Sequence, residues 1–201
     1  MPTASQYAQA YQAIGEYFCA FSAVEHELGE FIKLAYGLQS SEASDAIVAA
    51  LGDFSRKARL VRTAIKVAKY ADGSKTSGDW KANADATVKK AMGFNEPDRQ
   101  LLAHSLLQPN ADGSVTVVRL QVRDGKVTHT WSDEDFIKKI ADLMELTKEL
   151  QAINTDLRTV KITIPAGELS WMSGDALRSF STRASGPLMA ELSKPTAGPD
   201  E

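Results

Sequence analysis

The sequence is short of cysteine and of long apolar runs. Its single cysteine, Cys19, excludes an intrachain disulfide and any zinc site built from several cysteines. Tyr17, Phe18 and Phe21 surround it in the sequence and predict a buried free thiol, which fits a reducing compartment. No apolar run approaches the roughly 18 residues of a membrane-spanning helix, and the polar start MPTASQYAQAYQ is unlike a signal peptide. We therefore expect a cytoplasmic protein that is neither secreted nor inserted into a membrane.

The chain also has no excess of positively charged residues. The chain has 23 Lys and Arg against 26 Asp and Glu, a formal net charge of -3, which argues against a basic coat that binds nucleic acid indiscriminately. The 3 histidines are isolated from one another, and neither HExxH nor a paired-carboxylate spacing occurs. The sequence thus predicts no metal site and no cofactor. With 43% hydrophobic residues in 201, the chain can form one domain with its own core.

Apolar residues recur at steps of three and four, which is the period of amphipathic helices. The expected helices cover residues 5–37, 43–53, 54–70 and 80–92, a segment that begins near 95, and 133–158. Gly93 is a natural C-terminal stop for the fourth helix. Asn95 and Pro97 then either start a new helix or kink a continuous one.

Residues 115–131, VTVVRLQVRDGKVTHTW, predict a β-hairpin, because β-branched runs flank the turn dipeptide Asp124-Gly125. Ser132 is the expected N-cap of the last helix, with Asp135 in the capping-box position. The fold class that we expect is all-α, an antiparallel helical bundle with a small β-hairpin inserted before the last long helix. Residues 1–158 form this domain. We expect residues 159–201 to form a C-terminal extension that is partly disordered, with VKITIP as a candidate edge strand.

The segment NEPDRQLLAHSLLQPN places Arg99 and His104 five residues apart, near the end of a helix. Five residues turn an ideal helix by about 140°, so these side chains do not stack on one face. Gln100 does share a face with His104, and we expect it to orient the imidazole or to contact a phosphate. A histidine can take a proton from a ribose 2′-hydroxyl, and a guanidinium can stabilise the charge that develops on the phosphate. The alternative interpretation is a solvated arginine and a histidine with a structural role.

Two further sets of residues are candidates for supporting roles. Between residues 56 and 70 there are six basic residues and no acidic one. The basic residues that share one narrow arc opposite the apolar stripe are Arg59, Arg62, Lys66 and Lys69. They form either a phosphate-binding track for RNA or a solvated helix face. Glu25, close to the apolar stripe of the first helix, either pairs with Arg99 and orients its guanidinium or is a surface charge.

The sequence DRQLLAHS resembles the Arg-(four to six residues)-His motif of HEPN domains, an all-helical family with nucleotide-binding and RNase members. Gln100 takes the polar position after the arginine, and Leu102–His104 supplies the LAH ending. The order of elements is similar too, from VEHEL and GDFSRKARLV to the motif helix, the hairpin and the closing helix, over residues 5–157. There are two departures: Gln100 replaces the frequent asparagine, and Ser105 stands where glycine is common.

This resemblance implies a homodimer in which the motif helices meet, with Arg99 and His104 as catalytic residues. It implies a metal-independent endoribonuclease that cleaves RNA through attack of the 2′-hydroxyl. Such proteins act in phage defence, toxin–antitoxin pairs or RNA processing, so an antitoxin or another regulatory protein is an expected partner. The alternative is a noncatalytic module of the same fold that dimerises or binds a protein partner through the same helix.

Overall fold

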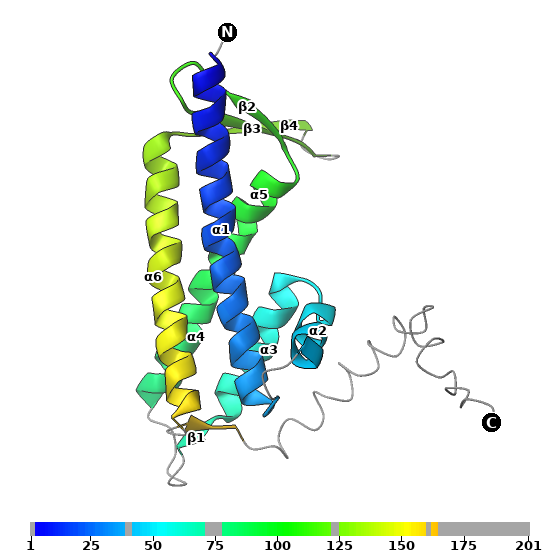
Figure 1. The fold of residues 1–201 in the computed structure, drawn as a ribbon, viewed down its shortest axis with the longest axis vertical. Helices are drawn as coiled ribbons and strands as arrows, with labels where there is room; N and C mark the ends of the chain where they lie inside the picture. Colours follow the sequence, from blue (N-terminus) through cyan, green and yellow to red (C-terminus); the bar gives the residue numbers. More distant parts are fainter. Residues whose placement is uncertain (1–2, 39–41, 71–77, 122–124, 160–161, 165–201) are drawn as a thin grey trace, which may run out of the picture.

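The computed structural model describes residues 3–38, 42–70, 78–121, 125–159 and 162–164. Most of these residues are helical, and a three-stranded antiparallel sheet lies at the end of the bundle where the first helix begins (Figure 1). The predicted hairpin tip at 122–124 and the predicted extension beyond residue 164 lie outside the described residues.

The helices agree with the apolar periodicity to within a few residues at most ends. They are α1 (Ala4–Ala35), α2 (Glu42–Ala50), α3 (Phe54–Val67), α4 (Gly78–Gly93), the π-helical turn η1 (Phe94–Arg99), α5 (Gln100–Ala103) and α6 (Asp133–Arg158). The strands are β1 (Lys69–Tyr70), β2 (Leu106–Pro109), β3 (Val115–Gln121), β4 (Gly125–Trp131) and β5 (Ile162–Thr163).

The two longest helices, α1 and α6, run side by side in the same direction (Figure 1). Near their starts, Gln9 Nε2 donates to Asp133 Oδ2 at 2.6 Å, and farther along, Asn154 Nδ2 donates to Glu27 Oε2 at 2.8 Å. The expectation of an antiparallel bundle is therefore wrong for this pair. The reason lies in the three-stranded sheet, which follows α5 in the sequence and lies at the end of the bundle where α1 begins (Figure 1). Helix α6 therefore starts at that end and runs beside α1 in the same direction.

The core follows the apolar stripes that the sequence predicts. Tyr17, Phe21 and Leu28 on α1 are buried, as are the apolar positions of α3, α4 and α6 that face them. Cys19, in contrast, is exposed, so the expectation of a buried thiol is wrong. Two residues turn a helix by about 200°, which puts Cys19 opposite the buried Tyr17.

The sheet contains the predicted hairpin and one strand that was not expected. Strands β3 and β4 pair antiparallel from Val115↔Trp131 to Gln121↔Gly125, which confirms the hairpin. Strand β2 adds to β3, with Leu106↔Val118 and Pro109↔Val115 as its end pairs. At the opposite end of the bundle, β5 pairs with β1, which confirms a strand within VKITIP.

The third helix ends three residues earlier than predicted. Ala68 has φ -58° and ψ 146°, which is an extended conformation, and Lys69 and Tyr70 continue as β1. The pairing of Lys69 with Thr163 and of Tyr70 with Ile162 supplies the backbone hydrogen bonds that a longer helix would have made. A contact almost a hundred residues away in the sequence thus decides where this helix ends.

The N-terminus of α6 has the predicted capping box. Asp135 N–H donates to Ser132 Oγ at 3.2 Å, and Ser132 N–H donates to Asp135 Oδ2 at 2.9 Å. We expect Ser132→Ala to lower the free energy of unfolding by about 1 kcal/mol, because a backbone donor of the first turn loses its acceptor. Urea denaturation measures this loss. Ser132→Thr keeps the hydroxyl and serves as the control, and an equal loss in both variants would contradict the cap.

Candidate functional site

The segment that carries the motif is a kinked continuation of α4. Glu96, with φ -128° and ψ 119°, interrupts the helical path inside η1. It precedes Pro97, and a residue before proline is driven out of the helical region by contact with the proline ring. The sequence left open whether a new helix starts at Asn95 and Pro97 or one helix is kinked there. In the structure, two helical stretches follow one another directly and meet at a kink at Glu96. Asn95, which is buried, ties the bend to α3 because its Nδ2 donates to Ser55 Oγ at 3.3 Å.

Arg99 is half-buried at the end of η1 and packs on α1. Its guanidinium carbon lies 5.7 Å from the centroid of the Phe21 ring, a cation–π distance. Within the described residues, its guanidinium makes no hydrogen bond and no ion pair. An arginine carries five N–H donors, so this one keeps its full capacity for an anion.

The neighbouring charges are already paired. Lys139 Nζ of α6 lies 2.5 Å from Asp98 Oδ2 and 4.7 Å from the centroid of the Trp131 ring. Tyr17 donates from its hydroxyl to the Phe94 carbonyl at 3.3 Å. Burial raises the pKa of Tyr17 well above its usual range, nearby Asp98 raises it further, and nearby Arg99 lowers it. Tyr17 therefore stays protonated as a donor beside the motif.

His104 lies at the point where the chain leaves the helix. Helix α5 has 4 residues, and His104 is its C-cap, with its N–H donating to the Gln100 carbonyl at 3.1 Å. The imidazole is exposed to solvent. Gln100 uses its amide Nε2 to donate to Glu96 Oε1 at 2.9 Å, and so it braces the kink. The structure thus has His104 accessible and Gln100 engaged with Glu96.

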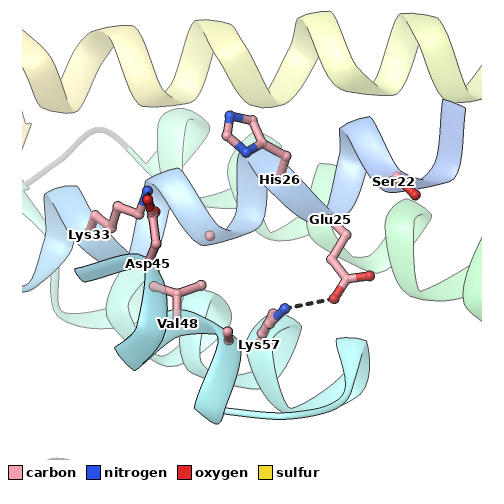
Figure 2. A pocket seen from close by; sticks show the side chains of 9 residues that line it. Ser22, Glu25, His26, Lys33, Asp45, Val48 and Lys57 are labelled. Carbon is pink, nitrogen blue, oxygen red and sulfur yellow. Dashed lines mark hydrogen bonds and ion pairs between the residues drawn. The ribbon is translucent and has the colours of Figure 1, made fainter. Parts of the chain in front are cut away.

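Glu25 is neither paired with Arg99 nor a fully solvated charge, the two alternatives that the sequence left open. Its Oε1 accepts a hydrogen bond from Lys57 Nζ of α3 at 2.7 Å, and Lys57 is only 8% exposed (Figure 2). The sequence does contain a signal for Lys57, because it lies between Phe54 and Val61 on the buried stripe of α3. A charge at such a position needs a buried partner.

The Lys57–Glu25 pair lies in a pocket of about 280 Å³ between α1, α2 and α3 (Figure 2). Lys33, also in this pocket, pairs with Asp45 of α2 and, at 2.6 Å, with Glu30. These two carboxylates accept hydrogen bonds from Lys33 and raise its pKa. Because the lysines of the pocket are matched by carboxylates, its lining favours neither an anion nor a cation.

The basic residues predicted to contact RNA differ in what they bind. Arg59 is exposed, and its Nε donates to the Ser55 carbonyl at 3.2 Å. Arg62 is half-buried, with Nε 2.6 Å from Asp85 Oδ1. Lys66 is exposed near the end of α3. Lys69 is exposed too, but it lies on β1 and no longer follows the arc of the helix.

No protein-family model matches this chain, and searches among curated proteins and among solved structures found no significant match. The structure itself defines a helix-rich protein with a small antiparallel sheet. In the part of the chain that it describes, no helix is long and apolar enough to cross a membrane. The same residues contain no group of three or more His, Cys, Asp or Glu placed to hold a metal ion.

Proposed function

We propose that this protein is a cytoplasmic, metal-independent HEPN-type endoribonuclease with Arg99 and His104 as its catalytic residues. The observation that carries the proposal is the half-buried guanidinium of Arg99, which packs on Phe21 and has no anionic partner among the described residues. A partly desolvated charge without a partner is costly, and an RNA phosphate would supply the missing partner. The planar guanidinium fits two phosphate oxygens at once.

The proposed reaction needs a base, an acid and a positive charge. His104 removes the proton from the ribose 2′-hydroxyl, and the 2′-oxygen forms a bond to phosphorus. The bond from phosphorus to the 5′-oxygen breaks, and a general acid protonates that oxygen. The products carry a 2′,3′-cyclic phosphate and a 5′-hydroxyl. Arg99 stabilises the negative charge on the phosphate oxygens during the attack.

The need for two proton transfers supports a homodimer. Each protomer supplies one motif histidine, so two copies of the motif segment around one cleft would supply both the base and the acid. His104 is exposed, and so is Leu106, which follows it and is 60% exposed. Both side chains are therefore available to a second copy of the chain.

The test is RNA cleavage in EDTA by purified wild type and Arg99→Ala. We expect the wild type to leave cyclic-phosphate ends, and the variant to cleave about 10²- to 10³-fold more slowly, because the phosphate loses its main charge-stabilising donor. Arg158→Ala is the matched control, since Arg158 is exposed and pairs with Glu30 at 3.2 Å, away from the motif. Cleavage by Arg99→Ala at the rate of the wild type would remove the motif from the mechanism.

A noncatalytic interaction module is the second candidate function. Large apolar side chains are exposed on the outer faces of the long helices, with Tyr11 at 55%, Ile137 at 68% and Met144 at 57%. Side chains of this kind are typical of protein contact surfaces. A wild-type protein that binds an antitoxin or another regulatory partner and leaves RNA intact in the EDTA assay would favour this second function.

A further inference from the structure

Helices α3 and α4 are antiparallel, and their facing side chains form a ladder along the seam between them. Lys81 Nζ of α4 donates to the Lys66 carbonyl of α3 at 2.7 Å. About one helical turn away along both helices, Arg62 Nε donates to Asp85 Oδ1 at 2.6 Å. The same spacing brings Arg59 of α3 level with the next turn of α4, which carries the exposed Lys89.

The seam is strongly positive although the whole chain is acidic. Its cations are Arg59, Arg62 and Lys66 from α3 and Lys81 and Lys89 from α4. Among them lies the carboxylate of Asp85, which is bound by Arg62 on one side and by Lys89 at 2.8 Å on the other. The hydrogen bond from Arg62, followed by that from Lys89, lowers the pKa of Asp85. Asp85 thus pairs with Arg62 and Lys89, whereas Arg59, Lys66 and Lys81 make no ion pair within the part of the chain that the structure describes.

One end of the seam adjoins the motif segment. Ser55, at the start of α3, accepts a hydrogen bond from Asn95 of η1 at 3.3 Å. Arg59 lies one turn farther along α3 and donates to the Ser55 carbonyl. From Arg59 to Lys66 the seam extends over about 10 Å at 1.5 Å per residue. The start of α3 therefore lies beside η1, whose last residue is Arg99.

We propose that the seam between α3 and α4 binds the phosphates of single-stranded RNA and guides the strand to the motif, with Lys81 and Lys89 as contacts beyond those on α3. The identification of the polyanion as RNA rests on the proposed function. Rows of lysine and arginine bind a phosphate backbone without reading its bases, and binding releases counterions. The logarithm of the binding constant therefore falls linearly with the logarithm of the salt concentration, with a slope of about -0.7 for each phosphate of a single strand that the protein neutralises.

The experiment measures the binding of a fluorescent single-stranded RNA to the full chain carrying His104→Ala, over a series of KCl concentrations. In this background, Lys66→Gln/Lys81→Gln and Arg59→Gln/Lys89→Gln are each expected to reduce the slope by about 1.4, since each pair removes two phosphate contacts. The control pair is Lys138→Gln/Lys148→Gln, whose lysines are exposed on α6. Thermal melting shows whether each variant remains folded.

Each outcome bears on the seam separately from the enzyme. Slopes that fall in both seam pairs and not in the α6 pair would support the seam, whether or not the wild type cleaves RNA. Equal slopes in all three pairs would overturn it, as would an absence of RNA binding at low salt. Displacement of the RNA by polyglutamate at a lower charge concentration than unlabelled RNA requires would overturn the assignment to RNA in favour of an acidic protein partner. Cleavage by the wild type together with unchanged slopes would leave the proposed enzyme in place without this track.

Discussion

His104→Ala is expected to slow RNA cleavage by about 10²- to 10⁴-fold, which is the usual contribution of a general acid or base. The fold should be unaffected. The imidazole is exposed, and the hydrogen bond from His104 to the Gln100 carbonyl uses the backbone N–H, which alanine retains. A rate measured in EDTA by gel analysis, together with an unchanged urea midpoint, would separate loss of chemistry from loss of structure.

The matched control for this prediction is His129→Ala. His129 is also exposed, but it lies on β4, paired with Val117 of β3. Its replacement should leave the cleavage rate within twofold of the wild type, because no proposed step uses it. A large loss in His129→Ala and none in His104→Ala would place the chemistry on the sheet, and the motif would then be structural.

The helical periodicity carries much of the fold because burial on a helix repeats every 3.6 residues. Phe21, Val24 and Leu28 are buried on α1, and Val61 and Ile65 on α3, at the spacing that their positions predict. Local signals sufficed where the stabilising contact is itself local. The Ser132 cap and the β3–β4 hairpin are examples, since their partners lie within a few residues along the chain or across one turn.

Features that depend on distant partners were not predictable from local patterns. Strand β2 exists because Leu106–Pro109 pairs with β3, and its sequence LLQP contains proline and no β-branched residue. Periodicity placed Glu25 near the buried stripe, but Lys57 and Arg99 both lie on other elements. Sequence spacing cannot choose between two partners whose distance from Glu25 is set by how the helices pack.

In the candidate site, too, the sequence predicts the local features, whereas the contacts between distant residues depend on the fold. The motif located Arg99 and His104, because their types and spacing are written in one short segment. The contact of Arg99 with Phe21 and the pairing of Asp98 with Lys139 depend on the kink at Glu96, which turns η1 between α1 and α6. The availability of the Arg99 guanidinium, on which the proposed function depends, is thus a property of the fold.

Phe136→Ala is expected to lower the free energy of unfolding by about 3–5 kcal/mol, the usual cost of removing a buried ring and leaving a cavity. Phe136 is 1% exposed, and its ring centroid lies 5.2 Å from that of Trp131, which in turn lies 6.0 Å from that of Tyr17. These three rings join the start of α6 to β4 and α1. Urea denaturation monitored by circular dichroism measures the loss.

The next residue along α6 provides the control. Ile137 is 68% exposed, so Ile137→Ala should change the unfolding free energy by less than about 0.5 kcal/mol. Similar losses in the two variants would mean that Phe136 is not in a packed core. The ring cluster also adjoins the motif, because Lys139 lies over Trp131 and holds Asp98. A cavity at Phe136 should therefore loosen the support of η1 and reduce cleavage even at temperatures where the variant remains folded.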